Sequence, residues 1–303
     1  MENHQKLKGL IAATFTPMDA KGNIDLSAID PYAELMIRSG LTGVFLCGTT
    51  GESASLTMEE QKDIISAWIK TVRGRIKVIV QVGCNAQQQA VDLAKYAYET
   101  GADGIAATAP YFFKPASVTE LVDFFAPIAA SAKEIPFYYY NIPSMTGVFL
   151  SVPDFLAKAK TLIPNLAGVK YTHINLMEMA QCLHMDNGAF EVFNGYDEIL
   201  LPGLALGAKA AVGSAFNYFS KVYFGIIDAF NNGDFEKARE LQIKSIEVVN
   251  IINRYGGSVR GGKAIMNILN IECGNCRLPI APFSEEEYKL LKEDLDKVGF
   301  FLH

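Results

Sequence analysis

Short apolar runs alternate with longer amphipathic segments along this chain. Most of the runs stay apolar throughout, which is typical of parallel strands that are covered on both faces. Lys77, Gln81 and Glu191 are the polar exceptions within them. The runs predict eight strands, at Leu10–Thr16, Gly43–Cys47, Ile76–Val82, Gly104–Thr108, Phe137–Tyr140, Ala167–Lys170, Phe190–Asn194 and Ala210–Gly213.

Helix-length segments fill the intervals, and several of them have recognisable ends. Thr57 and Glu60 have the spacing of a capping box at a helix start. Ser117 and Glu120 repeat that spacing before a later segment. Glycine tolerates the positive φ at which many helices end. Three glycines are expected to close a helix just before a strand: Gly40, Gly101 and Gly207.

The regular alternation predicts an α/β fold of the (β/α)8 TIM barrel class, with residues 1–230 as the barrel. An open, doubly wound sheet is the alternative that the pattern leaves open. After Gly213 the strand signals stop, and residues 231–303 are predicted to form a C-terminal helical extension. Helices are predicted at Ser220–Phe230, which would complete the barrel, and at Asp234–Tyr255, Gly261–Leu269 and Ser284–Val298.

Charge and hydropathy argue against several kinds of partner. The 303 residues carry a net charge of −6 without a basic run, so nucleic acid is not an expected partner. The longest apolar-looking stretch, residues 199–216, is broken by Pro202 and Lys209, so no membrane span is expected. Residues 1–8 lack the apolar core of a signal peptide, which predicts a cytoplasmic protein.

The chain has five cysteines, and an odd number favours free thiols in a reducing compartment. Cys273 and Cys276 have the spacing of a redox or zinc pair. No second pair and no cluster of histidines completes a metal site around them. We therefore expect two reduced thiols and no bound metal.

Lys170 is the first candidate for chemistry, because catalytic residues of such barrels lie at the carboxyl ends of the strands. It ends an apolar run, so its amine would emerge from a buried strand at the barrel mouth. Desolvation there would lower the pKa of the amine and free its lone pair to attack a ketone. The alternative is a strand-end lysine that extends into solvent.

Tyr140 ends the preceding strand and would hold a phenol near that amine, where it could relay protons. Alone, an aromatic triplet such as residues 138–140 more often packs in the core. Two loops add polar groups at the same end of the barrel. Gly48–Ser53 could hold a small carboxylate with its amides and hydroxyls, and Asp197 with Glu198 could accept hydrogen bonds from a polyol.

Four motifs together resemble the N-acetylneuraminate lyase and dihydrodipicolinate synthase family, in order and spacing, and the likeness covers the whole chain. They are Gly48–Glu52, Tyr140–Pro143, Gly168–Thr172 and Gly195–Glu198. The resemblance implies a homotetramer of barrels that binds pyruvate as a Schiff base without a metal or other cofactor. It implies that Lys170 is the nucleophile and that Tyr140 shuttles protons. It also implies that Thr49 and Thr50 hold the pyruvate carboxylate and contribute to the proton relay. Tyr111 would then reach a neighbouring subunit's site.

The second substrate distinguishes members of this family. Where the synthases usually carry an arginine, this chain has Met145. The sialate lyases resemble it in Lys170-x-Thr172 and in Gly-Tyr-Asp-Glu. The resemblance then implies that Thr172, Gly195, Asp197, Glu198 and Ser214 contact the sugar. We expect cleavage of sialic acid, N-acetylneuraminate, to N-acetylmannosamine and pyruvate.

Thr49 points the other way, because bacterial sialate lyases often have serine there and the synthases threonine; the exchange keeps the hydroxyl. Three alternatives therefore stay open. They are an aldolase for another 2-keto-3-deoxy sugar acid, the synthase reaction, and a non-catalytic barrel that senses sialate or pyruvate.

Overall fold

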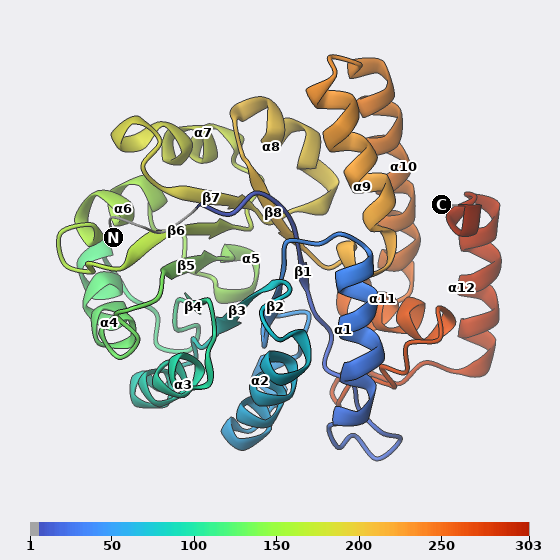
Figure 1. Ribbon diagram of the computed structural model, residues 1–303, viewed down its shortest axis with the longest axis horizontal. Helices are drawn as coiled ribbons and strands as arrows, with labels where there is room; N and C mark the ends of the chain where they lie inside the picture. Colours follow the sequence, from blue (N-terminus) through green and yellow to red (C-terminus); the bar gives the residue numbers. More distant parts are fainter. Residues whose placement is uncertain (1–5, 303) are drawn as a thin grey trace.

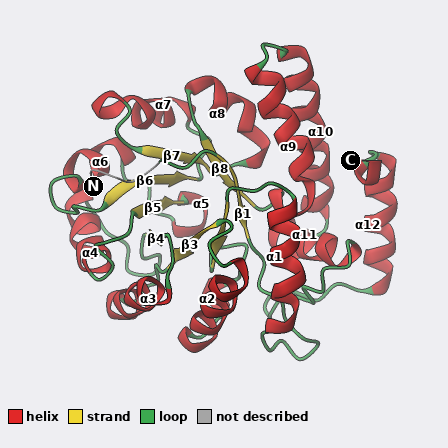
Figure 2. Cartoon of the chain, in the orientation of Figure 1, coloured by secondary structure: helices red, strands yellow, loops and turns green. Residues whose placement is uncertain are grey.

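Eight parallel strands close into a barrel, in which each strand pairs with the next along the chain and β1 pairs with β8. The computed structural model describes residues 6–302, and its helices lie around the ring of strands (Figure 1) (Figure 2). The closed barrel confirms the predicted fold class and excludes the open sheet. The strands are β1 Gly9–Ala13, β2 Gly43–Leu46, β3 Lys77–Gln81, β4 Gly104–Thr108, β5 Phe137–Asn141, β6 Leu166–Tyr171, β7 Glu191–Asn194 and β8 Ala210–Gly213.

All eight predicted strands are present, and β4 and β8 have the predicted bounds. The largest error is in β1, which ends at Ala13 instead of Thr16. The chain turns there into a loop, where the Thr16 hydroxyl donates a hydrogen bond of 2.7 Å to the Gly51 carbonyl. The polar residues within the strands have partners: Lys77 pairs with Asp103, for example, at 2.7 Å.

Twelve α-helices within residues 6–302 surround and extend the barrel. They are α1 Ile29–Arg38, α2 Met58–Val72, α3 Gln87–Thr100, α4 Val118–Ala130, α5 Pro143–Thr146, α6 Val152–Ala159, α7 Leu176–His184, α8 Leu200–Leu206, α9 Phe216–Asn231, α10 Phe235–Arg254, α11 Gly257–Ile268 and α12 Glu285–Lys297. Short 3-10 helices are η1 Leu26–Ala28, η2 Ser53–Ser55, η3 Met185–Asn187, η4 Asp197–Ile199 and η5 Phe300–Leu302.

The predicted helix ends are confirmed in part. Thr57 and Glu60 form the reciprocal capping box of α2. The second predicted box is wrong: Ser117 caps the Glu120 amide, but the Glu120 carboxylate accepts from the Ala116 amide, one residue earlier. The three predicted glycine ends are confirmed by positive φ values of 75° at Gly40, 105° at Gly101 and 107° at Gly207.

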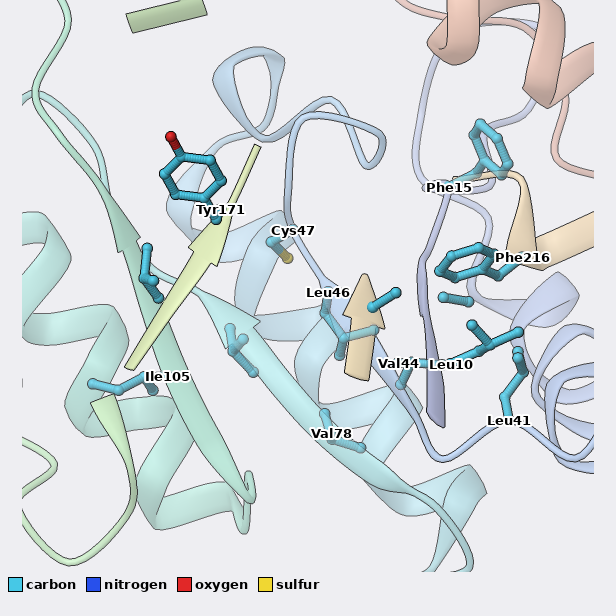
Figure 3. Close-up of a cluster of buried hydrophobic side chains, with 14 of the residues drawn as sticks. Leu10, Phe15, Leu41, Val44, Leu46, Cys47, Val78, Ile105, Tyr171 and Phe216 are labelled. Carbon is cyan, nitrogen blue, oxygen red and sulfur yellow. The ribbon is translucent and has the colours of Figure 1, made fainter. Parts of the chain in front are cut away.

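Two layers of apolar side chains form the core. One fills the barrel interior, with Ile11, Phe45 and Ile79 among its members. The other lies between the strands and the helices and contains Leu10, Val44, Leu46 and Val78 (Figure 3). Neighbouring strand residues thus point to opposite layers, as the pleat of a strand requires. Burial on both faces explains why the strands read as unbroken apolar runs.

Three helices follow the last helix of the barrel on one side of the molecule (Figure 1). α10 packs against α9, α11 and α12. The predicted start of the barrel's last helix, Ser220, is four residues late: α9 begins at Phe216 and is kinked at Phe219, where φ is −135°. The predicted start of α11 at Gly261 is also late: the two glycines at 256 and 257 obscured it in the sequence.

Within residues 6–302, no helix combines the length and the apolar character needed to cross a membrane. The expectation about a signal peptide rests partly on residues 1–5, which lie outside the described residues.

Candidate active site

A cavity of about 380 Å³ opens at the carboxyl ends of the strands and contains most of the predicted site residues. Its lining includes nine of the ten candidates: Thr49, Thr50, Tyr140, Lys170, Thr172, Gly195, Asp197, Glu198 and Ser214. The barrel therefore brings together residues that are far apart in the sequence. Tyr111 is the candidate that does not line it.

Lys170 and Tyr140 lie side by side across two neighbouring strands, as Cα partners in the pairing of β5 with β6. The Lys170 amine lies 3.9 Å from the centre of the Tyr140 ring and 4.0 Å from that of Phe45. Only 3% of Lys170 is exposed. The amine is therefore buried against two aromatic rings, and Lys170 lines the cavity.

This environment lowers the pKa of Lys170 to about 7, because burial disfavours the charged amine. The negative charge of Asp197 opposes the shift. An ordinary lysine is neutral in about one molecule in 2,500 at pH 7. With a pKa near 7, about half of the Lys170 amines carry a free lone pair at that pH.

The Tyr140 phenol makes a contact that suits proton relay. Its oxygen lies 3.2 Å from the Thr49 hydroxyl, within hydrogen-bond distance. Burial raises the pKa of Tyr140 to about 12, while the nearby hydroxyls of Thr49 and Thr172 oppose that rise. The phenol is therefore protonated at neutral pH, and it can accept a proton only while passing its own to another group.

The loop that carries Thr49 and Thr50 has an unusual backbone. Cys47 and Glu52, at its two ends, both have positive φ, at 54° and 56°. Such non-glycine conformations are costly and persist only where surrounding contacts hold them. The Glu52 carboxylate is fully buried and forms an ion pair of 2.8 Å with Lys263. Sequence reasoning included Glu52 in a motif but assigned it no partner.

Asp197 and Glu198 also line the cavity, from η4, which follows β7. Asp197 accepts a hydrogen bond of 2.8 Å from the Ala215 amide. Burial and the neighbouring Glu198 carboxylate raise the pKa of Asp197, while the Ala215 amide and Lys170 lower it. Gly213 leaves room for this carboxylate, because a Cβ at residue 213 would overlap it.

Thr172 presents a hydroxyl to the same cavity. Within the described residues its Oγ1 is buried without a well-formed hydrogen bond, but it lies close enough to the Tyr140 phenol to lower the pKa of that group. Gly195 lies against it, since a Cβ there would overlap Oγ1. A buried polar atom without a partner costs stability, so one that lines a cavity points to a ligand.

Tyr111 lies outside this cavity. Its amide and that of Phe112 donate to the Asn85 side chain, which fixes the loop after β4. Tyr111 is 41% exposed and lines a separate, more apolar hollow of about 260 Å³, which also contains Thr49 and Met145. Within this chain, therefore, its phenol is not grouped with Lys170.

Tyr196 also lines the cavity; sequence reasoning included it in a motif without giving it a role. Sequence reasoning missed three further lining residues: Tyr218, Asn253 and Ser258. Tyr218 comes from α9, and the last two flank the junction of α10 and α11. The rule of strand ends could not reveal Asn253 and Ser258, because α10 and α11 lie beyond the last strand. A tyrosine just after β8 was the one available signal.

A larger hollow of about 590 Å³ lies at the other end of the barrel, where the strands begin. Its lining contains none of the ten candidate residues. Two of its cations are already paired, Lys77 with Asp103 and Arg75 with Glu34. Volume alone therefore does not identify the site.

The cysteines fit the prediction of free thiols, since none of the five forms a disulfide. Burial raises the pKa of Cys273 and of Cys276 to about 12 in each case, so both thiols stay protonated at neutral pH. Among residues 6–302, no group of three or more histidine, cysteine or acidic side chains has an arrangement that could hold a metal ion.

Comparison with known proteins gives matches over nearly the whole chain. A model of the dihydrodipicolinate synthetase family matches residues 6–298. The chain is 39% identical to the N-acetylneuraminate lyase of Danio rerio over 282 residues, which is 92% of each protein.

Among solved structures, the N-acetylneuraminate lyase (sialic acid aldolase) from Aliivibrio salmonicida matches with a TM-score of 0.95 at 38% identity, over 98% of each chain. The N-acetylneuraminate lyase of Proteus mirabilis also matches with a TM-score of 0.95, at 33% identity, over 98% of this chain and 100% of its own.

Proposed function

Because this chain belongs to the dihydrodipicolinate synthetase family, we propose that it is a class I aldolase that cleaves N-acetylneuraminate reversibly to N-acetylmannosamine and pyruvate. That activity makes it a carbon–carbon lyase. The lyases from Danio rerio, Aliivibrio salmonicida and Proteus mirabilis, at 39%, 38% and 33% identity over most of the chain, support this substrate.

The Lys170 amine is the observation that carries the proposal. It is buried beside Tyr140, and its pKa falls to about 7, so a large fraction is neutral and nucleophilic at physiological pH. A structural lysine has no need of this environment, which disfavours its charge. The sensor hypothesis gives no reason for the pairing with a phenol.

The reaction begins when the Lys170 nitrogen attacks the C2 ketone of the open-chain sugar and one water leaves. The resulting protonated imine draws the electrons of the C3–C4 bond toward C2, which leaves an enamine. As that bond breaks, the C4 hydroxyl gives up its proton, and C4 becomes the aldehyde carbon of N-acetylmannosamine. The enamine then takes a proton at C3, and water releases pyruvate and the free amine.

Tyr140 is proposed to receive the C4 proton through the substrate carboxylate. Since its pKa is about 12, it passes its own proton onward as it does so, and the Thr49 hydroxyl at 3.2 Å is available for that relay. Thr49 and Thr50 are proposed to bind the pyruvate carboxylate. Thr50 is buried and lines the same cavity as Thr49 and Lys170.

The sugar chain is proposed to bind at the part of the cavity that η4 lines. Asp197 and Glu198 can accept hydrogen bonds from hydroxyls. Thr172 and Ser214 can donate or accept, and Gly195 keeps the space beside Thr172 open. Met145, which is 63% exposed and lines the same cavity, cannot pair with a second carboxylate. This difference favours a sugar over the acidic aldehyde of the synthase reaction.

We also propose a homotetramer in the cytoplasm, with residues 1–230 as the catalytic barrel and residues 231–303 as a helical extension. The loop after β4 supports an interface between subunits. Tyr111, Phe112 and Phe113 are 41%, 74% and 85% exposed, which is unusual for adjacent aromatic residues. Sedimentation of the purified protein tests this, since a stable monomer would contradict it.

Two measurements test the proposed function. Borohydride reduction in the presence of pyruvate should add the mass of the reduced pyruvate adduct at Lys170, and pyruvate should be released from N-acetylneuraminate. Lys77→Met, at an exposed strand lysine, serves as the control for Lys170→Met. An unmodified Lys170 would end the proposal. Trapping without sialate cleavage, but with cleavage of a shorter 2-keto-3-deoxy acid, would favour the alternative substrate.

A further inference from the structure

Two buried polar side chains on the helices beyond the barrel each contact a different segment that lines the cavity. Lys263, on α11, contacts the loop that carries Thr49 and Thr50 through Glu52. Gln242, on α10, contacts the segment that carries Asp197. Lys263 is 1% exposed and Gln242 is 6% exposed.

The first contact is an ion pair between residues 211 positions apart in the sequence. Lys263 Nζ lies 2.8 Å from Glu52 Oε1 and also donates to the Asn275 carbonyl at 2.9 Å. The second Glu52 oxygen accepts a hydrogen bond of 2.9 Å from the Arg277 amide. Both carboxylate oxygens are thus held by the C-terminal part of the chain.

Glu52 in turn contacts Thr49 through the backbone. Glu52 has a φ of 56°, and its amide donates a hydrogen bond of 3.0 Å to the Thr49 carbonyl. The left-handed backbone at Glu52 must be stabilised by contacts from outside the loop, since a non-glycine residue rarely adopts it. The buried ion pair with Lys263 supplies such a contact, so the loop's shape depends on a helix outside the barrel.

The second contact braces the start of α8 and the segment before it. The Gln242 amide group donates to the Asp197 carbonyl at 3.2 Å, and its oxygen accepts from the Leu201 amide at 2.8 Å. The Leu201 amide belongs to the first turn of α8, where backbone donors lack partners within the helix. Gln242 therefore contacts the backbone both before and after Glu198 in the sequence. Ser245 orients Gln242 through a hydrogen bond of 2.8 Å.

We propose that Lys263 and Gln242 are positioning residues with separate tasks. Lys263 holds the carboxylate-binding loop, and Gln242 holds the segment that binds the sugar hydroxyls. This inference rests on the proposed function, because that function assigns the two ends of the substrate to these two segments. The helical extension is then a working part of the site as well as a covering of the barrel.

The test compares Lys263→Met and Gln242→Met with Lys237→Met, a surface lysine of α10 that serves as the control. Each variant is assayed for the pyruvate concentration that half-saturates borohydride trapping at Lys170, and for KM and kcat on N-acetylneuraminate. Lys263→Met should raise the half-saturating pyruvate concentration by about tenfold or more, because small displacements of binding groups are costly. Gln242→Met should leave pyruvate trapping within about twofold and raise KM for the sugar by about tenfold.

Removing Lys263 alone leaves the Glu52 carboxylate buried without its cation, which can unfold the chain. The double variant Glu52→Gln with Lys263→Met removes both charges and keeps the volume. If this variant melts near the wild-type temperature and its half-saturating pyruvate concentration is still raised, Lys263 positions the loop. If it melts normally and binds pyruvate like the wild type, the pair is only structural and the proposal is wrong.

Equal effects of Lys263→Met and Gln242→Met on both substrates would also overturn the separation of tasks. Failure of the proposed function gives a different result. A wild-type protein that pyruvate and borohydride do not label refutes the Schiff base, and the proposal about Lys263 with it. A wild type that is labelled but does not cleave sialate refutes the substrate only. The contrast in pyruvate trapping between the two variants then still tests whether Lys263 positions the carboxylate-binding loop.

Discussion

Ala167 and Val169 lie two residues apart on β6, yet their side chains face opposite sides of the strand. Ala167 packs inside the barrel, and Val169 packs in the layer between strands and helices. In a regular strand, residues two apart share a face. The alternation is therefore reversed between them, just before Lys170.

A shift in strand pairing accounts for the reversal. Leu166 pairs with the residue of β5 that precedes Tyr138, and Tyr138 itself pairs with Gly168, so Ala167 is left over. Such a bulge redirects the side chains that follow it. Without it, Lys170 would point outward with Val169 inside. Lys170 faces the cavity because the strand carries one extra residue.

Gly168→Ala should misdirect the amine. A Cβ at residue 168 would overlap the Glu191 carbonyl of β7, so the two strands must separate at the bulge. We expect pyruvate trapping at Lys170 to fall by about 100-fold, since misplacement by about 1 Å has effects of that size. The control is Gly104→Ala on β4, where the nearest atom to an added Cβ is 3.4 Å away. Unchanged trapping in Gly168→Ala would show that the close approach of Gly168 to the Glu191 backbone does not determine the orientation of the Lys170 side chain.

The pKa of Lys170 predicts how stability depends on pH. Burial lowers the pKa to about 7 in the folded protein, against an ordinary value of 10.5. Between these two pH values the unfolded chain binds one more proton than the folded one, so this group makes stability rise with pH, by at most about 1.4 kcal/mol per pH unit. Lys170→Met removes that contribution. The variant should be more stable than the wild type near pH 7, and the difference should shrink toward pH 10 in urea titrations.

The same group should control activity. The neutral fraction of Lys170 rises about tenfold from pH 6 to pH 8 if its pKa is near 7. The value of kcat/KM, which reports ionisation in the free enzyme, should rise with it. A profile that is flat over this range would show that the amine is not the titrating nucleophile.

Thr172→Val should separate activity from stability. Within the described residues the Thr172 hydroxyl is buried without a well-formed hydrogen bond, so its removal should cost the folded protein little stability. It should also let the pKa of Tyr140 rise, because this hydroxyl lowers it. We expect an unchanged or slightly higher melting temperature and a loss of about tenfold in kcat/KM on N-acetylneuraminate, close to the value of one hydrogen bond. Thr146→Val is the matched contrast, because the Thr146 hydroxyl donates to the Ile142 carbonyl at 3.1 Å. That variant should lose stability instead. A large drop in melting temperature for Thr172→Val would mean that its hydroxyl has a structural partner.

The sequence predicts contacts that follow from the order of strands, and it misses those that depend on tertiary packing. Lys170 and Tyr140 are the last residues of two consecutive predicted strands, so a barrel makes them neighbours, and the structure places them in register. The bulge is hidden, because residues 166–170 read as one apolar run, although Gly168 marks it in retrospect. No pattern connects Glu52 with Lys263, since helix propensity and hydropathy carry no information about a pair 211 residues apart.

Tyr140→Phe tests the relay most directly, because it removes one oxygen and keeps the ring. The aromatic surface that desolvates Lys170 remains, so the pKa of the amine should stay low and pyruvate trapping should persist. Cleavage of the C3–C4 bond should slow by about 100-fold to 10,000-fold, the usual contribution of a positioned proton-transfer group. Thr49→Val, which removes the hydroxyl 3.2 Å from the phenol, should slow the same step less, because water can replace it as the proton acceptor. Single-turnover measurements resolve the bond-cleaving step from imine formation. If Tyr140→Phe slowed imine formation alone, the phenol would serve the attack of Lys170 on the ketone, and the assignment of Tyr140 to the C4 proton would have to be withdrawn.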